Sequence, residues 1–161
     1  MMEWFSASVF KLNKLMQVVS GVALSFIVLL TTADVIMRAF GQPIIGTYEI
    51  VAMCGGIVIG FIAPITAWMR GHVYVDLLVK RFSPALQNLV NVITRCVAIV
   101  LFTMVSLNVV KIGNNFRAAG EISSSLQLPL YPVAYAVALS FFMLALTLGC
   151  DILKIRAHTY E

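Results

Sequence analysis

The sequence predicts an all-α integral membrane protein with four transmembrane helices and both termini in the cytoplasm. Of its 161 residues, 61% are hydrophobic and only 11% are charged, whereas a soluble domain has roughly 45–50% apolar and about 25% charged residues. Four apolar runs, at about 15–36, 48–68, 86–110 and 133–150, approach or exceed the roughly 20 residues that a helix needs to cross a bilayer. Because the connections between these runs are short, we expect residues 1–161 to form a single membrane domain.

The distribution of lysine and arginine predicts the orientation of these helices. Cytoplasmic connections carry an excess of basic residues near the ends of spans. The N-terminal segment, the second connection and the C-terminal segment hold seven of them: Lys11, Lys14, Arg70, Lys80, Arg81, Lys154 and Arg156. The first and third connections hold three: Arg38, Lys111 and Arg117. This asymmetry places both termini in the cytoplasm.

An amphipathic segment precedes the first span. Four apolar residues recur there at helical spacing: Phe5, Val9, Leu12 and Met16. Three polar residues are available for the opposite side: Lys11, Asn13 and Lys14. We therefore expect an interfacial helix that leads into the membrane. The apolar stretch that follows is longer than the roughly 7–15 residues of a secretory signal, so we interpret it as a span.

Three charged residues gather around the first connection, at 40–47. Asp34 and Arg38 are four residues apart and should share one helix face, and Glu49 follows across a short hairpin. Thr47 is placed to cap the second helix, and Glu49 in its first turn favours the positive end of the helix dipole. Such a cluster suits a proton or ion relay, or a structural lock within the chain or to a partner helix. We favour the lock, because all three charges lie at the ends of spans.

The second span contains Gly56 and Gly60, which are four residues apart. Small residues at this spacing allow the backbone of another helix to approach closely in a membrane. We therefore expect a helix contact at these two glycines.

The connection at 70–83 reads as an amphipathic helix at the cytoplasmic surface. Alternating Val and Leu residues also fit a strand, but a lone strand at a bilayer surface leaves its edges unpaired. Arg70, His72 and Asp76 are grouped in this segment. They are candidates for a local hydrogen-bonded cluster or for a contact with a partner.

The third span holds the one basic residue within a run, Arg95. An arginine at mid-span costs at least about 2.5 kcal/mol, so Arg95 should extend toward the cytoplasm or pair with an acid.

The outer loop that follows is expected at 111–132. Ser125, Leu126, Leu128, Pro129 and Tyr131 make it a candidate docking surface for a partner outside the membrane. A plain surface loop that enters the membrane only slightly fits the same residues equally well.

Other function classes find little support in the residues. Cys54, Cys96 and Cys150 lie inside predicted spans and read as small buried residues, and both histidines, His72 and His158, lie in cytoplasmic segments, which argues against axial haem ligands. The basic residues that give the net charge of +4 flank spans and form no long block of the kind that binds nucleic acid. We therefore predict no enzyme activity, no cofactor, no metal site and no nucleic-acid partner.

Four segments together resemble the small (Q-type) membrane subunit of tripartite ATP-independent periplasmic (TRAP) transporters. They are Asp34-Val-Ile-Met-Arg38-Ala-Phe40, Gly46-Thr-Tyr-Glu49-Ile50, Arg70-Gly-His72-Val-Tyr-Val-Asp76 and Ser125-Leu-Gln-Leu-Pro129. The resemblance implies a bacterial inner-membrane importer in which a periplasmic binding protein captures an organic anion, such as a dicarboxylate or sialic acid. A large membrane subunit then moves the anion with sodium, and the small subunit supports the large one as a scaffold.

Two alternatives remain open from the residues. A self-sufficient, homo-oligomeric small transporter should carry an acidic residue in mid-span, whereas Asp34 and Glu49 lie at span ends. A membrane anchor of a redox complex is compatible with the four spans in a form without haem.

Overall fold

A computed structural model describes residues 2–69 and 84–156 of the chain. It contains four helices: α1 (Met2–Ala39), α2 (Thr47–Trp68), α4 (Pro84–Ala119) and α5 (Tyr131–Arg156). Each is long and apolar enough to cross a membrane. The predicted all-α, four-helix fold class is therefore confirmed. The expected amphipathic connection at 70–83, with Arg70, His72 and Asp76, lies outside the described residues.

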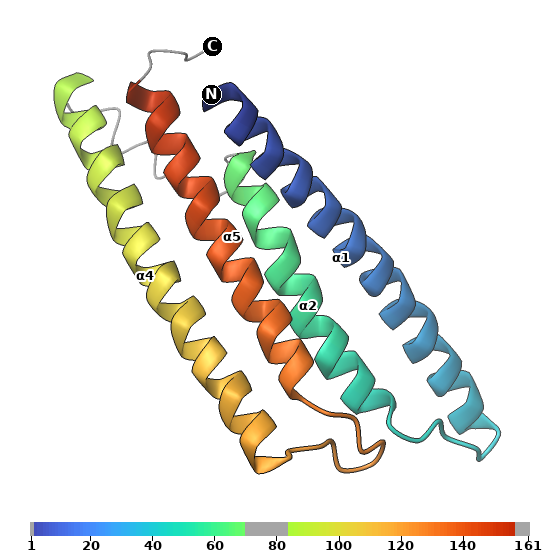
Figure 1. The fold of residues 1–161 in the computed structure, drawn as a ribbon. Coiled ribbons are helices and arrows are strands. Elements are labelled where there is room, and N and C mark those ends of the chain that lie inside the picture. Colours follow the sequence, from blue (N-terminus) through green and yellow to red (C-terminus); the bar gives the residue numbers. More distant parts are fainter. Residues whose placement is uncertain (1, 70–83, 157–161) are drawn as a thin grey trace.

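The helices lie side by side in the order α1, α2, α5, α4 (Figure 1), and α5 contacts each of the other three, so it is called the central helix below. In the most apolar part of α5, 39% of the residues are buried, against 11% in α1 and in α4, which form the edges. The loops at 40–46 and 120–130 lie together at one end of the bundle, called the loop end below. The start of α1 and the end of α5 lie at the opposite, terminal end.

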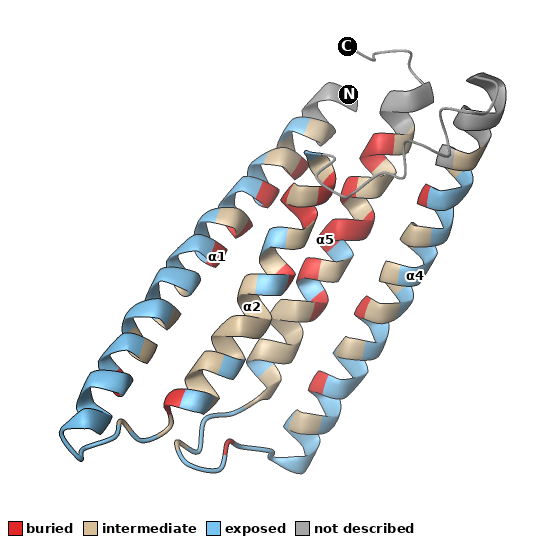
Figure 2. Cartoon of the chain, turned by 180° about the vertical axis from the view of Figure 1, so that it is seen from behind, coloured by how far each residue is buried: buried red, intermediate tan, exposed pale blue. Residues whose placement is uncertain are grey.

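Burial is concentrated toward the terminal end of the bundle (Figure 2). Val9 and Met16 of α1 pack there with Met143 and Cys150 of α5, and Phe61, Trp68 and Leu146 surround this cluster. The segment that carries Val9 and Met16 is continuous with the rest of α1. The amphipathic segment that was expected at the interface therefore supplies part of the core.

The α4–α5 loop is shorter than the expected outer loop at 111–132, because α4 continues as a helix to Ala119. Contacts with α5 explain this extension. Gly113 lies so close to α5 that a Cβ atom there would come within 2.8 Å of the Tyr135 ring. The Tyr135 hydroxyl donates a hydrogen bond to Asn114 Oδ1 at 2.7 Å. Residues that read as loop formers in the sequence are thus held in a helix by their neighbour.

Glycines in the left-handed region mark the helix ends at the loop end. Gly41 has a φ of 76° and donates to the Arg38 carbonyl at 3.0 Å, which closes the last turn of α1. Gly46 has a φ of 81° and occupies the N-cap of α2 without a side-chain cap bond. The expected cap at Thr47 is therefore wrong by one position. Its hydroxyl instead donates to the Ile44 carbonyl at 3.0 Å, within the loop.

Candidate functional site

Asp34 organises the α1–α2 loop. Its side chain is 7% exposed, and its Oδ2 atom accepts a hydrogen bond from Arg38 Nε at 2.7 Å. Its Oδ1 atom accepts a second bond from the backbone N–H of Ile44 at 2.9 Å. The Arg38 guanidinium also lies 5.1 Å from the ring centroid of Tyr48, in the first turn of α2. These contacts join the end of α1 to the loop and to α2, as in a structural lock within the chain.

Glu49 belongs to a different set of contacts from Asp34 and Arg38. Its carboxylate accepts bonds from Ser123 Oγ at 2.7 Å, from Ser125 N at 2.7 Å and from Leu126 N at 3.1 Å. All three donors belong to the α4–α5 loop, more than seventy residues away in the sequence. The expected three-residue charge cluster is therefore divided between the two loops.

The α4–α5 loop is folded back on itself. Ser123 N donates to the Leu128 carbonyl at 2.9 Å, and Gln127 adopts a φ of 54° between them. An isolated antiparallel bridge joins Ile122 to Pro129. The Leu126 side chain covers Gly46, so that any Cβ at Gly46 would collide with it. The loop therefore has a defined shape, and its hydrogen bonds to Glu49 of α2 hold it in place.

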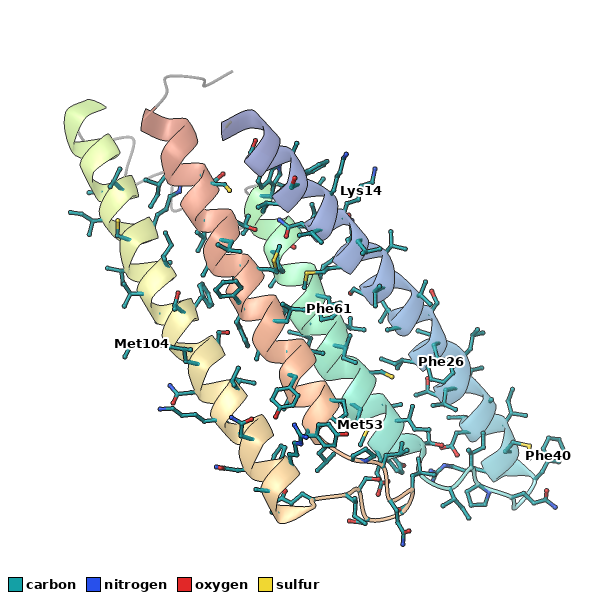
Figure 3. All side chains as sticks on the ribbon, viewed as in Figure 1. Lys14, Phe26, Phe40, Met53, Phe61 and Met104 are labelled. Atoms are coloured by element: carbon teal, nitrogen blue, oxygen red, sulfur yellow. The ribbon has the colours of Figure 1, made fainter. Side chains whose placement is uncertain are left out.

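The predicted docking residues fall into two groups. The backbone N–H groups of Ser125 and Leu126 are bound by Glu49, whereas the Leu128 side chain is 41% exposed. Pro129 takes part in the bridge, and the Tyr131 ring packs edge-on against Tyr135 at a centroid distance of 6.1 Å. Other large apolar side chains in or next to the two loops are also exposed: Phe40, which Figure 3 labels, Ile45, Tyr48 and Ile122. Leu128 and these four residues are exposed apolar side chains of the loop end, and together they are named the loop-end apolar surface.

Gly56 and Gly60 of α2 face α5. A Cβ at Gly60 would lie 2.6 Å from Ser140 Oγ, and one at Gly56 would lie 3.9 Å from a Val137 methyl group. The two helices therefore approach each other more closely at Gly60 than at Gly56. Gly60 allows α2 to pack directly on the central helix.

Arg95 pairs with an acid that the sequence reading did not single out. Its Nη2 atom lies 3.6 Å from Asp151 Oδ2, and the two side chains are 10% and 9% exposed. The pair joins α4 to α5 toward the terminal end. The sequence did contain a signal for Asp151: an arginine within a span needs an acid at the same depth in the membrane.

Asn13 is fully buried, although the sequence placed it on the polar side of the first segment. Its Nδ2 atom donates to Thr147 Oγ1 at 2.8 Å, and both side chains have 0% exposure. This bond joins α1 to α5. Two serines make similar connections: Ser20 Oγ donates to the Val58 carbonyl at 3.0 Å, and Ser106 Oγ donates to the Ala138 carbonyl at 2.8 Å.

Polar contacts thus tie α1 to α2, α1 to α5, and α4 to α5, and a glycine contact joins α2 to α5. A family model described as "Tripartite ATP-independent periplasmic transporters, DctQ component" matches residues 27–157. The chain belongs to this family. No curated protein sequence and no solved structure matches the chain.

Membership in the DctQ family identifies the chain as the small membrane subunit of a TRAP transporter, and the four apolar helices make it a multi-pass membrane protein. The family is one of transporter components and not of enzymes. Within 2–69 and 84–156, no group of three or more His, Cys, Asp or Glu side chains could hold a metal ion. The described geometry of this DctQ-family chain is that of helices held together by paired polar groups.

Proposed function

We propose that this DctQ-family chain is the scaffold subunit of a sodium-coupled importer of organic anions, carboxylates such as dicarboxylates or sialic acid. It supports the large transport subunit in the bacterial inner membrane and helps to present it to a periplasmic binding protein. Sodium binding and anion movement belong to the large subunit. Substrate selection belongs to the large subunit and the binding protein.

One observation carries this proposal: the acidic side chains of the described spans are bound within the chain. Asp34 binds Arg38 and the α1–α2 loop, Glu49 binds the α4–α5 loop, and Asp151 lies beside Arg95. A driving ion in a secondary transporter binds near the midplane, where broken helices supply carbonyl groups. Here α1, α2, α4 and α5 are each continuous, and Asp34, Glu49 and Asp151 all face groups of the same chain.

The arrangement of the two ends supports an orientation with both termini in the cytoplasm. The α1–α2 and α4–α5 loops share one end of the bundle, and the described basic residues near that end are Arg38, Lys111 and Arg117. The described residues toward the terminal end include four basic ones, Lys11, Lys14, Lys154 and Arg156, and an excess of basic residues is typical of the cytoplasmic side. The loop-end apolar surface then faces the periplasm, on the side where a soluble binding protein would dock.

Purification of the tagged chain from membranes that also contain the large subunit tests this proposal. We expect the large polytopic subunit to be retained in mild detergent, and the binding protein to be retained by the pair when substrate is present. As a matched control, the same purification is repeated from membranes that lack the large subunit. Recovery of this chain alone from membranes that contain the large subunit, combined with transport by this chain alone in liposomes, would contradict the scaffold role.

A further inference from the structure

The outer face of α4 carries a stripe of exposed side chains. Its members follow one another at alternating intervals of four and three residues: Val97, Leu101, Met104, Asn108, Lys111 and Asn115. Val97, Leu101 and Met104 are 61%, 50% and 61% exposed, and Met104 points away from the bundle (Figure 3). An open groove of about 570 Å³ runs along the apolar part of this outer stripe. This spacing is the one at which two helices pack along a continuous seam.

Asn108 is the member of the outer stripe whose polar atoms make it costly to expose to lipid. It lies in the uncharged stretch between Arg95 and Lys111, which is about 24 Å long at roughly 1.5 Å per residue. Its Nδ2 atom donates one bond to the Met104 carbonyl at 2.9 Å. The second amide hydrogen and the Oδ1 atom bind no group in the described part of the chain, and lipid chains offer no partner for them.

The outer face of α1 differs in this respect, although it also carries exposed apolar side chains. Between residues 15 and 33, its exposed polar residues are two hydroxyls that donate to their own helix: Ser25 donates to the Gly21 carbonyl at 3.0 Å, and Thr32 donates to the Val28 carbonyl at 2.7 Å. A hydroxyl has one hydrogen to donate, so these bonds satisfy its donor within the helix. The face of α1 is therefore suited to lipid, whereas a partner with polar groups would satisfy the remaining atoms of Asn108 on the face of α4.

We propose that the outer stripe of α4, and not the outer face of α1, binds a transmembrane helix of the large subunit. This inference rests on the proposed function. The partner helix presents a side chain that both donates and accepts hydrogen bonds, such as an amide, opposite Asn108, and an acidic side chain near Lys111. The apolar part of the outer stripe supplies packing area, and Asn108 fixes the register of the two helices, as a single polar residue does in a coiled-coil seam.

Tryptophan substitutions on the two helices test which face is occupied. Leu101→Trp and Met104→Trp on α4 are compared with Val22→Trp and Leu29→Trp on α1, whose native side chains are 66% and 70% exposed. Binding of the large subunit is measured in nanodiscs by energy transfer between labels on the two proteins. We expect each α4 variant to weaken binding by roughly 5- to 150-fold, the range that overpacking produces, and each α1 variant to bind like the native chain.

A second pair of variants tests Asn108 itself. Asn108→Leu should weaken binding by roughly three- to twentyfold, since the hydrogen bonds measured between membrane helices have that effect. The matched variant Ser25→Leu, on the face assigned to lipid, should bind like the native chain. Thermal unfolding of each variant without the large subunit confirms that the fold is unchanged, because all of these positions are exposed.

The outcomes separate this inference from the proposed function. If the native chain does not bind the large subunit at all, the proposed function fails. If the native chain binds and the α4 variants bind equally well, or if the α1 variants lose binding, the assignment of the surface is wrong. Loss of self-association by Asn108→Leu, with unchanged binding to the large subunit, would identify a second copy of this chain as the occupant and overturn the inference.

Discussion

Replacing Gly60 by alanine should weaken the packing of α2 on the central helix. An alanine Cβ at this position would lie 2.6 Å from Ser140 Oγ and 3.4 Å from Ser140 Cβ. The hydroxyl cannot turn aside freely, because it donates a hydrogen bond to the Val137 carbonyl at 2.6 Å. The variant must therefore break that bond or move the two helices apart.

The size of the effect follows from two opposing contributions. Overpacking of a well-filled contact costs about 1–3 kcal/mol, whereas alanine is about 1 kcal/mol more favourable than glycine inside a helix. Gly55→Ala is the matched control, because a Cβ at Gly55 meets nothing within 4 Å and receives only the favourable contribution. The helix contribution cancels between the two variants. Gly60→Ala should therefore be less stable than Gly55→Ala by about 1–3 kcal/mol.

The assay is reversible unfolding of the purified chain in bicelles, which gives the free energy of unfolding of each variant. A second substitution, Ser140→Ala, removes the closest atom and should recover part of the loss in the Gly60→Ala background. If Gly60→Ala and Gly55→Ala differ by less than about 0.5 kcal/mol, the spread within which independent effects usually add, the close approach of α2 and α5 is not as described.

Three further predictions concern the polar contacts. Glu49→Gln should speed amide hydrogen exchange in the α4–α5 loop, because a neutral amide accepts weaker bonds than a carboxylate, whereas Glu121→Gln in the same loop should leave exchange unchanged. Asp34→Ala should speed exchange in the α1–α2 loop, since it removes the acceptor of a loop N–H, and unchanged exchange would contradict this role. A double-mutant cycle with Asn13→Leu and Thr147→Val should give a coupling of about 0.6 kcal/mol and at most about 1.7 kcal/mol. Zero coupling would mean that the buried bond at 2.8 Å does not form.

The number and type of helices could be predicted from the sequence because hydropathy and length alone determine which segments can cross a membrane. The ends of the helices were less predictable. The Gly113-Asn-Asn115 segment reads as a loop, yet it stays helical because Tyr135 packs over Gly113 and binds Asn114. A contact with another helix decided this boundary, and the local sequence does not contain that information.

The pairing of polar groups was predictable only where the partners are close in the sequence. Asp34 and Arg38 are four residues apart, and their bond follows from helical spacing. Asn13 and Thr147 are separated by 134 positions. Because the pattern of α1 reports only which residues are apolar, it assigned Asn13 to the polar surface and could not reveal an acceptor on α5.

Glu49 shows the same limit at the loop end. The short α1–α2 hairpin suggested Asp34 and Arg38 as its neighbours, whereas the structure places the Ser123–Ser125 segment over it. The fold of the α4–α5 loop decides this pairing. The candidate docking surface changes accordingly, from the loop as a whole to the exposed side chains that remain after Glu49 has bound its backbone.

Reconstituted transport tests the central claim most directly. Proteoliposomes that contain the large subunit, this chain or both are supplied with the binding protein, a labelled organic anion and a sodium gradient. The scaffold account predicts uptake with both membrane proteins, little uptake without this chain, and none with this chain alone. Sodium-driven uptake by this chain in the absence of the large subunit would contradict the account.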